Sequence, residues 1–457
     1  MHDILTDPDL AEDMVWAPRK IYDGDGNCVY TELWTGDWWW TMQSLLHPRE
    51  RMPTGGSCTI IPIILSSDKV LHGAQSGNST SWPLYLTVGN IPSKKRWLLT
   101  KPYARLIGLL PDIKGIIFER YFLTKTDADT GKGLEARHAL FHNTLSRILE
   151  PLYQVMDNGI SIKCGDGVQR RCYPRLAQYL ADYEEQHLLA GILSGSCPTC
   201  LIPFFRKSRA DAPYLNPNTF PPREGDHAYD SRTRFSDDLK SLRNLGYHSI
   251  IPFSEHYHHM EFNRFCSIYD ALSPDLLHQL SKNFWDYIYA INIKALLKLG
   301  TSEKKIAAEI DAHLSHVPMY QDLKWFRHGC SKIKRWTGKE YKNMLRIFLC
   351  IIRDIVPDDV VKFTRAFMDI HRMSHYESYT SNEGRETAIP GTVELLEQAI
   401  DDFRQCLIQP DNFLIKSEIL QLGWYTPKMH YAHHYAECIR QKGTLPQCST
   451  DRSEALH

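Results

Sequence analysis

The chain has 457 residues, and its 53 lysines and arginines almost balance its 54 aspartates and glutamates. It is therefore not a polycation, and any contact with nucleic acid must come from local basic patches. It has no run of about 18 apolar residues and no signal peptide pattern, which predicts a soluble intracellular protein. The 12 cysteines are scattered, which argues against a disulfide framework, and the one tight pair is Cys197 and Cys200.

Residues 58–92 contain two strand-like runs, and the first is apolar from Ile60 to Leu65. Such a run suits a strand that is covered on both faces of a sheet. It ends abruptly in Asp68 and Lys69. Because ligands in sheet proteins usually gather at the exposed ends of strands, Asp68 is a candidate site residue. A turn cap is the alternative explanation.

A helix is expected over residues 134–154, where apolar positions recur at helical spacing. The next strand covers residues 159–164 and leads to a second aspartate, Asp166. Pro174 can occupy the first turn of a helix that runs to about Gln186, which places Asp182 within that helix. Residues 188–193 then predict a strand.

The pattern changes after Cys200. A proline-rich stretch reaches about residue 252, and periodic segments then predict helices near residues 272–300, 302–316, 338–353, 358–374 and 391–408. We expect a mixed α/β core interrupted by a large, mostly α-helical insertion. Its segments are an N-terminal cover (1–57), the first part of the core (58–200), the insertion (201–440) and a final helix region (441–457).

Several motifs follow one another along the chain: Ser67-Asp-Lys69, Trp82-Pro-Leu-Tyr-Leu-Thr-Val-Gly-Asn90, Cys164-Gly-Asp166, Ala181-Asp-Tyr-Glu-Glu-Gln186, Cys197-Pro-Thr-Cys200, Pro274-Asp-Leu-Leu-His278, Trp336-Thr-Gly-Lys-Glu-Tyr341 and Ser453-Glu-Ala-Leu-His457. In this order the sequence resembles the Plavaka-type DNA transposases of fungi, which belong to the DDE class. The resemblance runs from about Arg19 to the last residue. It implies an RNase H-like catalytic core, DNA as partner (transposon ends and target), a homo-oligomer and a nuclear location.

Two-metal cleavage of a phosphodiester needs several carboxylates at one point, because Mg²⁺ and Mn²⁺ prefer hard oxygen ligands. Asp68 and Asp166 each end a predicted strand, so neighbouring strands would bring them together. The resemblance places the third acid at Glu454. Asp182 is the rival for the second position, and we prefer Asp166 because a charged residue within a helix usually lies on its exposed face.

Cys197 and Cys200 have the spacing of half a zinc site. The resemblance suggests that distant histidines complete such a site, and His256 and His278 are the candidates. A pair of reduced, buried cysteines is the alternative. A later group, His430, His433 and His434, has two members on one helical face, and we expect it to pack or to contact DNA phosphate rather than to bind metal.

Four lysines and two arginines are candidates for DNA contact, and all but Lys69 stand in short basic runs: Lys69, Lys94, Lys95, Arg96, Lys334 and Arg335. Solvated surface charge is the alternative for each of them. The resemblance implies a transposase that hydrolyses and transfers DNA strands. Because the sequence ends three residues after Glu454, a catalytically inactive, truncated or domesticated relative that only binds DNA or protein is the second hypothesis.

Overall fold

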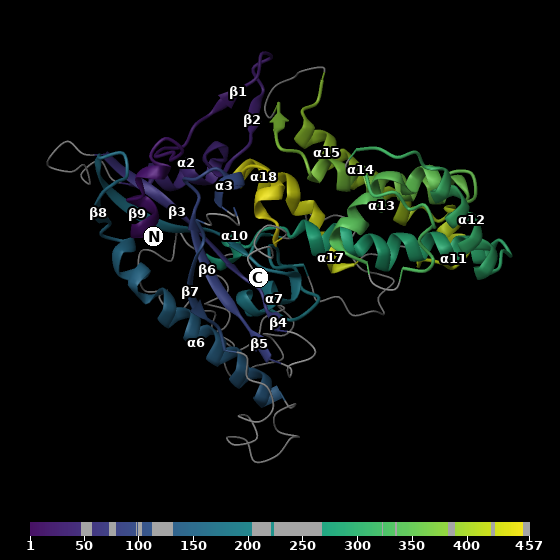
Figure 1. The fold of residues 1–457 in the computed structure, drawn as a ribbon, viewed down its shortest axis with the longest axis horizontal. Coiled ribbons are helices and arrows are strands. Elements are labelled where there is room, and N and C mark those ends of the chain that lie inside the picture. The colour runs from purple at the N-terminus through teal and green to yellow at the C-terminus, as the bar shows by residue number, and fades with distance from the viewer. Residues whose placement is uncertain are drawn as a thin grey trace.

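A computed structural model describes residues 1–46, 57–72, 79–96, 98, 103–111, 131–202, 221–223, 267–321, 323–333, 336–382, 389–421 and 426–450. Within these ranges a five-stranded mixed sheet lies in the N-terminal half, and the C-terminal part is mostly helical. Figure 1 shows the sheet and the long helix α6 on one side of the molecule and the helices α11 to α15 on the other, with α18 between them.

The sheet has the order β7-β6-β3-β9-β8. Its strands are β3 (Ser57–Ser67), β6 (Pro83–Val88), β7 (Arg105–Leu109), β8 (Ile160–Lys163) and β9 (Gln169–Leu180). Strands β3, β6 and β7 pair antiparallel, β9 pairs parallel to β3, and β8 pairs antiparallel to β9 at the edge. A two-stranded hairpin, β4 (Val70–His72) and β5 (Ser79–Ser81), lies between β3 and β6 along the chain.

Strand β3 is buried on both faces, as its apolar run predicts. Ile61, Ile63 and Leu65 belong to the core that includes helix α6 (Gly131–Met156). Ile60 and Ile64 belong to a second core on the other face, where Trp38 and Trp39 of helix α2 (Asp37–Ser44) pack. The alternation of side chains along a strand places these two sets on opposite faces.

Two sequence predictions around this sheet are wrong. Residues 174–180 continue strand β9 rather than starting a helix, and Pro174 pairs with Ile61. The pairing of β9 with β8 ends at Cys172, which leaves a place where a residue without an N–H is tolerated. The next element, α7 (Tyr183–Ala190), is a helix, so residues 188–190 are not a strand. The predicted helix at 134–154 and the strand at 159–164 are confirmed as α6 and β8.

The C-terminal helices pack around a separate apolar core. They are α10 (Ile268–Ala271), the π-type turns η7 (Leu277–Ser281) and η8 (Phe284–Tyr289), α11 (Ala290–Lys298), α12 (Glu303–His316), α13 (Gly338–Ile352), α14 (Asp358–Ser374), α15 (Thr392–Ile408), α16 (Phe413–Lys416), α17 (Pro427–Tyr431), η9 (Ala432–His434), α18 (Tyr435–Lys442) and η10 (Leu445–Cys448). The five helical regions predicted beyond residue 272 are thereby confirmed. In this core the rings of Phe363 and Phe403 lie 5.0 Å apart and join α14 to α15.

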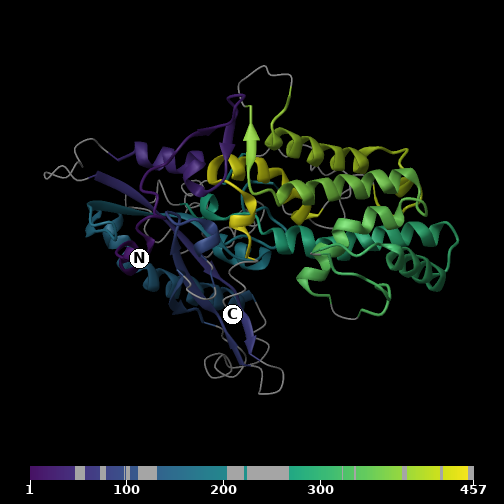
Figure 2. The ribbon, with the colours of Figure 1, turned by 45° about the horizontal axis from the view of Figure 1, so that its top comes forward.

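The N-terminal residues connect the sheet to the helical part. They form α1 (His2–Leu5), η1 (Pro8–Leu10), β1 (Ile21–Tyr22), β2 (Cys28–Tyr30) and η2 (Leu33–Thr35), and α3 (Ser93–Arg96) follows β6. Strand β2 pairs with both β1 and β10 (Tyr379–Ser381), which lies between α14 and α15. Figure 2 shows this small three-stranded sheet above the junction of the two parts.

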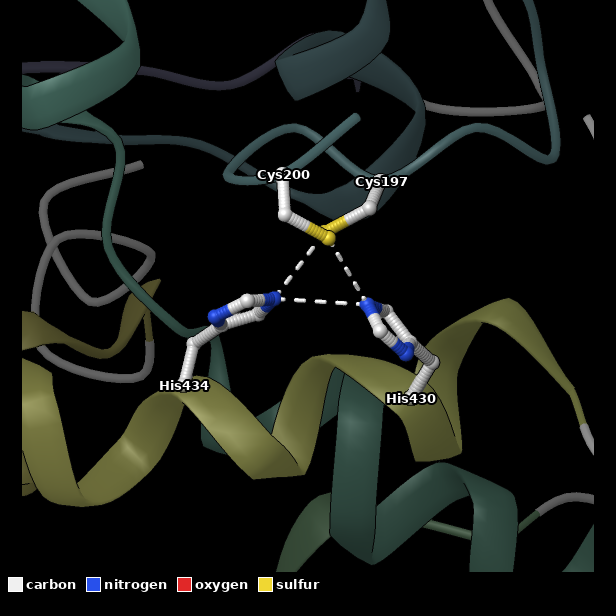
Figure 3. Close-up of side chains that lie close together, drawn as sticks. All are labelled: Cys197, Cys200, His430 and His434. Carbon is white, nitrogen blue, oxygen red and sulfur yellow. Dashed lines mark hydrogen bonds between the residues drawn. The ribbon is translucent and has the colours of Figure 1, made fainter. Parts of the chain in front are cut away.

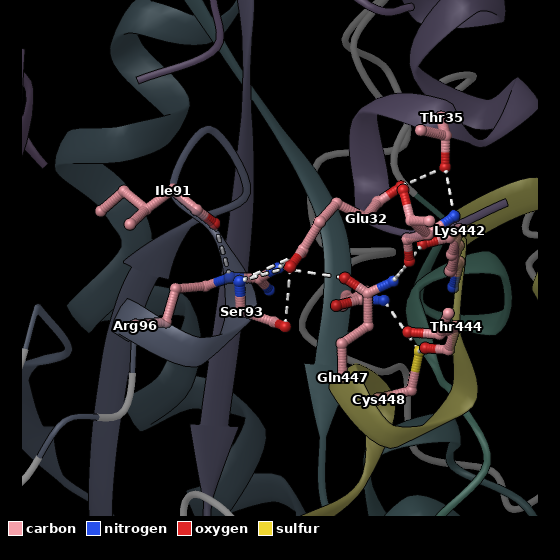
Figure 4. A network of polar contacts seen from close by, with 11 residues as sticks. Glu32, Thr35, Ile91, Ser93, Arg96, Lys442, Thr444, Gln447 and Cys448 are labelled. Atoms are coloured by element: carbon pink, nitrogen blue, oxygen red, sulfur yellow. Dashed lines mark hydrogen bonds and ion pairs between the residues drawn. The ribbon is translucent and has the colours of Figure 1, made fainter. Parts of the chain in front are cut away.

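A buried polar network ties the C-terminal segment to the sheet (Figure 4). The Arg96 guanidinium is fully buried and donates to Glu32 Oε2 at 3.0 Å and to Gln447 Oε1 at 3.0 Å. Gln447 in turn donates to the carbonyl of Thr31. Gly443 has a φ of 85° and packs against the carbonyls of Thr31 and Glu32, where a Cβ would collide. Segments more than 350 residues apart in sequence are thus fixed to one another.

Replacing Arg96 by methionine should lower the free energy of unfolding by about 3–5 kcal/mol, because the substitution leaves the Glu32 carboxylate, which is only 19% exposed, without its cationic partner. Lys94→Met is the matched control. Lys94 is exposed and pairs with the equally exposed Glu377, so its loss should change stability by less than about 1 kcal/mol. Denaturant unfolding of both variants measures the difference, and equal effects would contradict the role assigned to the buried network.

Candidate metal sites at the sheet edge and beside helix α7

Two aspartates lie at the carboxyl ends of neighbouring strands, because β3 and β9 run parallel. We call this edge of the sheet, which carries Asp68 and Asp182, the acidic edge. Ser66 pairs with Leu180 near the carboxyl ends of these strands. Asp68 follows β3 directly, and Asp182 follows β9 after a single intervening residue. The carboxyl ends of parallel neighbours meet at one edge, so the loops that carry Asp68 and Asp182 emerge side by side.

Asp166 lies at the opposite edge, so the expectation that it meets Asp68 is wrong. It stands in the turn between β8 and β9, before the paired residue Arg170 at the start of β9. The run of β9 from Arg170 to Leu180 separates it from the other edge by about 33 Å. Asp166 binds Arg170 through two hydrogen bonds of 2.7 Å, and these bonds lower the pKa of its carboxyl group. The rival residue, Asp182, is the one that the fold brings near Asp68.

Glu185 joins the two acidic loops, and sequence reasoning missed it. Asp182 caps helix α7 by accepting the N–H of Glu185 at 2.8 Å. The Glu185 carboxyl group accepts the hydroxyl of Ser67, the neighbour of Asp68, and the indole N–H of Trp82 at 3.2 Å. Burial raises the pKa of Glu185 well above its ordinary value, and the charges of Asp182 and Asp68 raise it further. This one residue therefore contacts both loops as well as Trp82, the residue before β6.

A second group of side chains has the composition of a metal site (Figure 3). The two thiols of the loop after α7 face two histidines from α17 and η9: Cys197, Cys200, His430 and His434. Their ligand atoms all lie within 4.8 Å of one another. The Cys200 sulfur lies 3.2 Å from His430 Nε2, the Cys197 sulfur lies 3.3 Å from His434 Nε2, and the two Nε2 atoms are 3.3 Å apart.

These distances fit tetrahedral zinc. Zn–S and Zn–N bonds of about 2.3 and 2.0 Å place neighbouring ligand atoms roughly 3.3–3.8 Å apart. Hydrogen bonding with Cys197 lowers the pKa of the Cys200 thiol, and His430 and His434 lower it further. The N–H of Thr199 also points at the Cys197 sulfur, at 3.3 Å. A thiolate is therefore favoured in the pair before any cation binds, and thiolates are the form that holds zinc.

The structure does not bring the expected histidines to this group. His278 lies against Asp275, with 2.5 Å between its Nδ1 and Asp275 Oδ2, and its Nε2 contacts Lys282. His256 lies outside the described residues. Because His430 and His434 are four residues apart on α17 and η9, both can present Nε2 to one point. Burial and the neighbouring histidines lower the pKa of His433, which is not one of the four.

The basic residues predicted to contact DNA differ in burial and in their ion pairs. Arg96 is fully buried in the network with Glu32, so its prediction as a DNA contact is wrong. Lys95 pairs with Asp13 and Lys94 with Glu377 at the surface. The exposed Lys69 lies beside the acidic edge, with its ammonium 5.6 Å from the centre of the Trp82 ring. Lys334, Arg335 and Glu454 lie outside the described residues.

The fold and these two groups define a mixed α/β protein with an acidic sheet edge and a Cys2His2 cluster that joins the loop after α7 to α17 and η9. A sequence model of the Plavaka transposase family matches residues 1–290, which is more than half of the chain, and the chain belongs to that family. Membership implies DNA as the partner. The matched residues include the sheet, α7 and the cysteine pair, and they end before His430 and His434 of the Cys2His2 cluster. No curated protein matches the sequence. No helix in the described ranges is both long and apolar enough to cross a membrane.

The protein purified without chelators should contain about one zinc per chain, as measured by elemental mass spectrometry. Cys200→Ser should lose most of it, because a hydroxyl group is a poor replacement for a thiolate. Removing the metal should lower the midpoint of thermal unfolding by about 4 °C, since a tightly bound ligand contributes about 4 kcal/mol and the unfolding entropy of a chain of this length is about 1 kcal/mol per kelvin.

Cys350→Ser serves as the control for that substitution, because Cys350 is exposed and does not belong to the four-residue group. Its zinc content should equal that of the unmodified chain. Zinc-free wild-type protein, or equal loss in both serine variants, would contradict the site.

Proposed function

We propose that this protein is a DDE-type DNA transposase that cuts and joins phosphodiesters at the sheet edge, with Asp68, Asp182 and Glu454 as its three acids. The observation that carries the proposal is the parallel pairing of β3 and β9, which brings the loops of Asp68 and Asp182 together. An antiparallel run of β3, β6 and β7, then helix α6, then a strand parallel to β3 is consistent with an RNase H-like core.

The path of the C-terminal segment supports Glu454 as the third acid. Gln178 of β9 donates to the Cys448 sulfur at 3.0 Å, and Gln178 precedes Asp182 by four residues. Thr450 is the last described residue, and Glu454 follows it by four positions. Thr450 itself lies against Asp275, and four residues span at most about 14 Å, so an acid at position 454 would be within reach of the acidic edge.

The acids would hold two Mg²⁺ or Mn²⁺ ions, which activate the attacking oxygen and stabilise the leaving oxygen when bound. The residues Asp68 and Asp182 supply oxygen ligands from two fixed loops. Glu185 holds both loops through its contacts with Ser67 and Asp182. Lys69, which is exposed next to Asp68, would contact a DNA phosphate. Such fixed positioning of charge is what phosphoryl transfer requires.

The zinc cluster would act as a structural clamp. It joins the loop after α7 to helix α17, and α18 and the C-terminal segment follow α17 directly. On the α7 side, the buried His187 lies 2.9 Å from the carbonyl of Ser196, next to Cys197. Zinc would therefore fix the helix capped by Asp182 relative to the segment that leads to Glu454.

A nicking assay on supercoiled plasmid with Mg²⁺ or Mn²⁺ tests the proposal. Asp68→Asn and Asp182→Asn should each reduce cleavage by about a thousandfold, because each removes a carboxylate that positions charge in the transition state. Asp166→Asn is the matched control and should retain activity within about twofold, since Asp166 lies at the far edge of the sheet.

Loss of activity in Asp166→Asn but not in Asp182→Asn would contradict this assignment. If the folded wild-type chain shows salt-dependent DNA binding but no metal-dependent nicking, the alternative of an inactive, DNA-binding relative replaces the proposed activity.

A further inference from the structure

The motif Pro274-Asp-Leu-Leu-His278 holds the C-terminal segment at the acidic edge. The carboxylate of Asp275 is fully buried, and it lies three residues after Leu272, which forms a parallel bridge with Tyr179 of β9. The side chain of Gln186 donates to the carbonyls of both Ala181 and Ser273 at 2.9 Å. Asp275 therefore belongs to a segment that is fastened directly beside Asp182.

The two oxygens of Asp275 have different partners. Oδ1 accepts the hydroxyl of Thr450 at 2.9 Å and lies 3.4 Å from both the Thr450 N–H and the Ser449 hydroxyl. Oδ2 lies 2.5 Å from His278 Nδ1. Burial alone would raise the pKa of Asp275, but the bonds from His278 and Thr450 outweigh burial and lower it. A carboxylate accepts all of these bonds, and an amide in its place would have to give up one of them.

His278 orients the carboxylate. Since Asp275 is an acceptor, His278 carries its proton on Nδ1 and donates it to Oδ2. The other nitrogen, Nε2, then faces the ammonium of Lys282 as an acceptor. With Oδ2 held by the imidazole, Oδ1 is free to point at Ser449 and Thr450. The side chains of Asp275 and His278 thus have partners within the protein, and His278 contacts Asp275 and Lys282 instead of the cysteine pair.

We propose that Asp275, oriented by His278, is a positioning residue for the third proposed acid: it anchors Thr450 and thereby fixes the point from which the chain continues to Glu454. This inference rests on the proposed function. A second attachment supports it, because the ammonium of Lys442 at the end of α18 contacts the carbonyl of Asp270 and lies 3.3 Å from the Ser273 hydroxyl. The segment after α18 is thereby held at both of its ends against residues 270–275.

Mn²⁺ binding to the zinc-loaded chain, measured by calorimetry, tests this inference without relying on catalysis. Asp275→Asn should weaken Mn²⁺ binding by about tenfold, the effect expected when the support of a metal ligand is removed. Thr450→Val, which keeps the side-chain volume and removes one donor, should weaken binding by about threefold. Neither substitution should weaken it further in a Glu454→Gln background, because Asp275 and Thr450 act through Glu454.

Thr364→Val is the matched control, because Thr364 is equally buried and accepts a bond from Asn292 in the helical part. It should leave Mn²⁺ binding unchanged. Wild-type affinity in Thr450→Val and in folded Asp275→Asn would overturn the inference, and so would further loss of affinity in the Glu454→Gln background. If wild-type binding is absent or insensitive to Asp68→Asn, the proposed function fails first and the inference falls with it.

Discussion

The parallel pairing of β3 with β9 is the constraint on which the candidate site depends. It brings together the ends of two strands that are separated by more than 100 residues of chain, and it places Asp68 and Asp182 in adjacent loops. An antiparallel pairing of the same strands would have put these aspartates at opposite edges. Helix α7 then begins at Asp182, so the capping bond from Glu185 and the contact of Glu185 with Ser67 couple the two loops.

The rest of the structure holds distant segments against this edge. The Cys2His2 cluster connects the loop after α7 to α17, the network of Glu32, Arg96 and Gln447 fixes η10, and Asp275 binds Ser449 and Thr450. All three connections involve the region from α17 to Thr450. This convergence explains why a large helical part can stand between the second and the third acid of the proposed site. The helices return the chain to the edge, and buried polar contacts determine where it arrives.

Local patterns in the sequence predicted much of the fold but not the pairing of distant segments. The apolar run of β3, the helix α6 and the helices beyond residue 272 follow from periodicity alone. Pro174 suggests the start of a helix that would contain Asp182. Pairing with β3 instead makes residues 174–180 part of strand β9, so Asp182 lies after a strand. A local signal for the correct boundary existed, since Asp182 precedes Glu185 by three residues, as in a helix N-terminal cap. No local signal could select His430 and His434 for the cysteine pair, because that choice depends on how the helices pack.

The most direct test of the account is a crystal structure of the protein soaked in Mn²⁺, with anomalous scattering used to locate both metals. The account predicts manganese between Asp68 and Asp182 at the carboxyl ends of β3 and β9, zinc among Cys197, Cys200, His430 and His434, and no manganese at Asp166. Manganese bound at Asp166, or an edge near Asp68 and Asp182 that stays empty at saturating Mn²⁺, would contradict the claim that parallel pairing assembles the metal site.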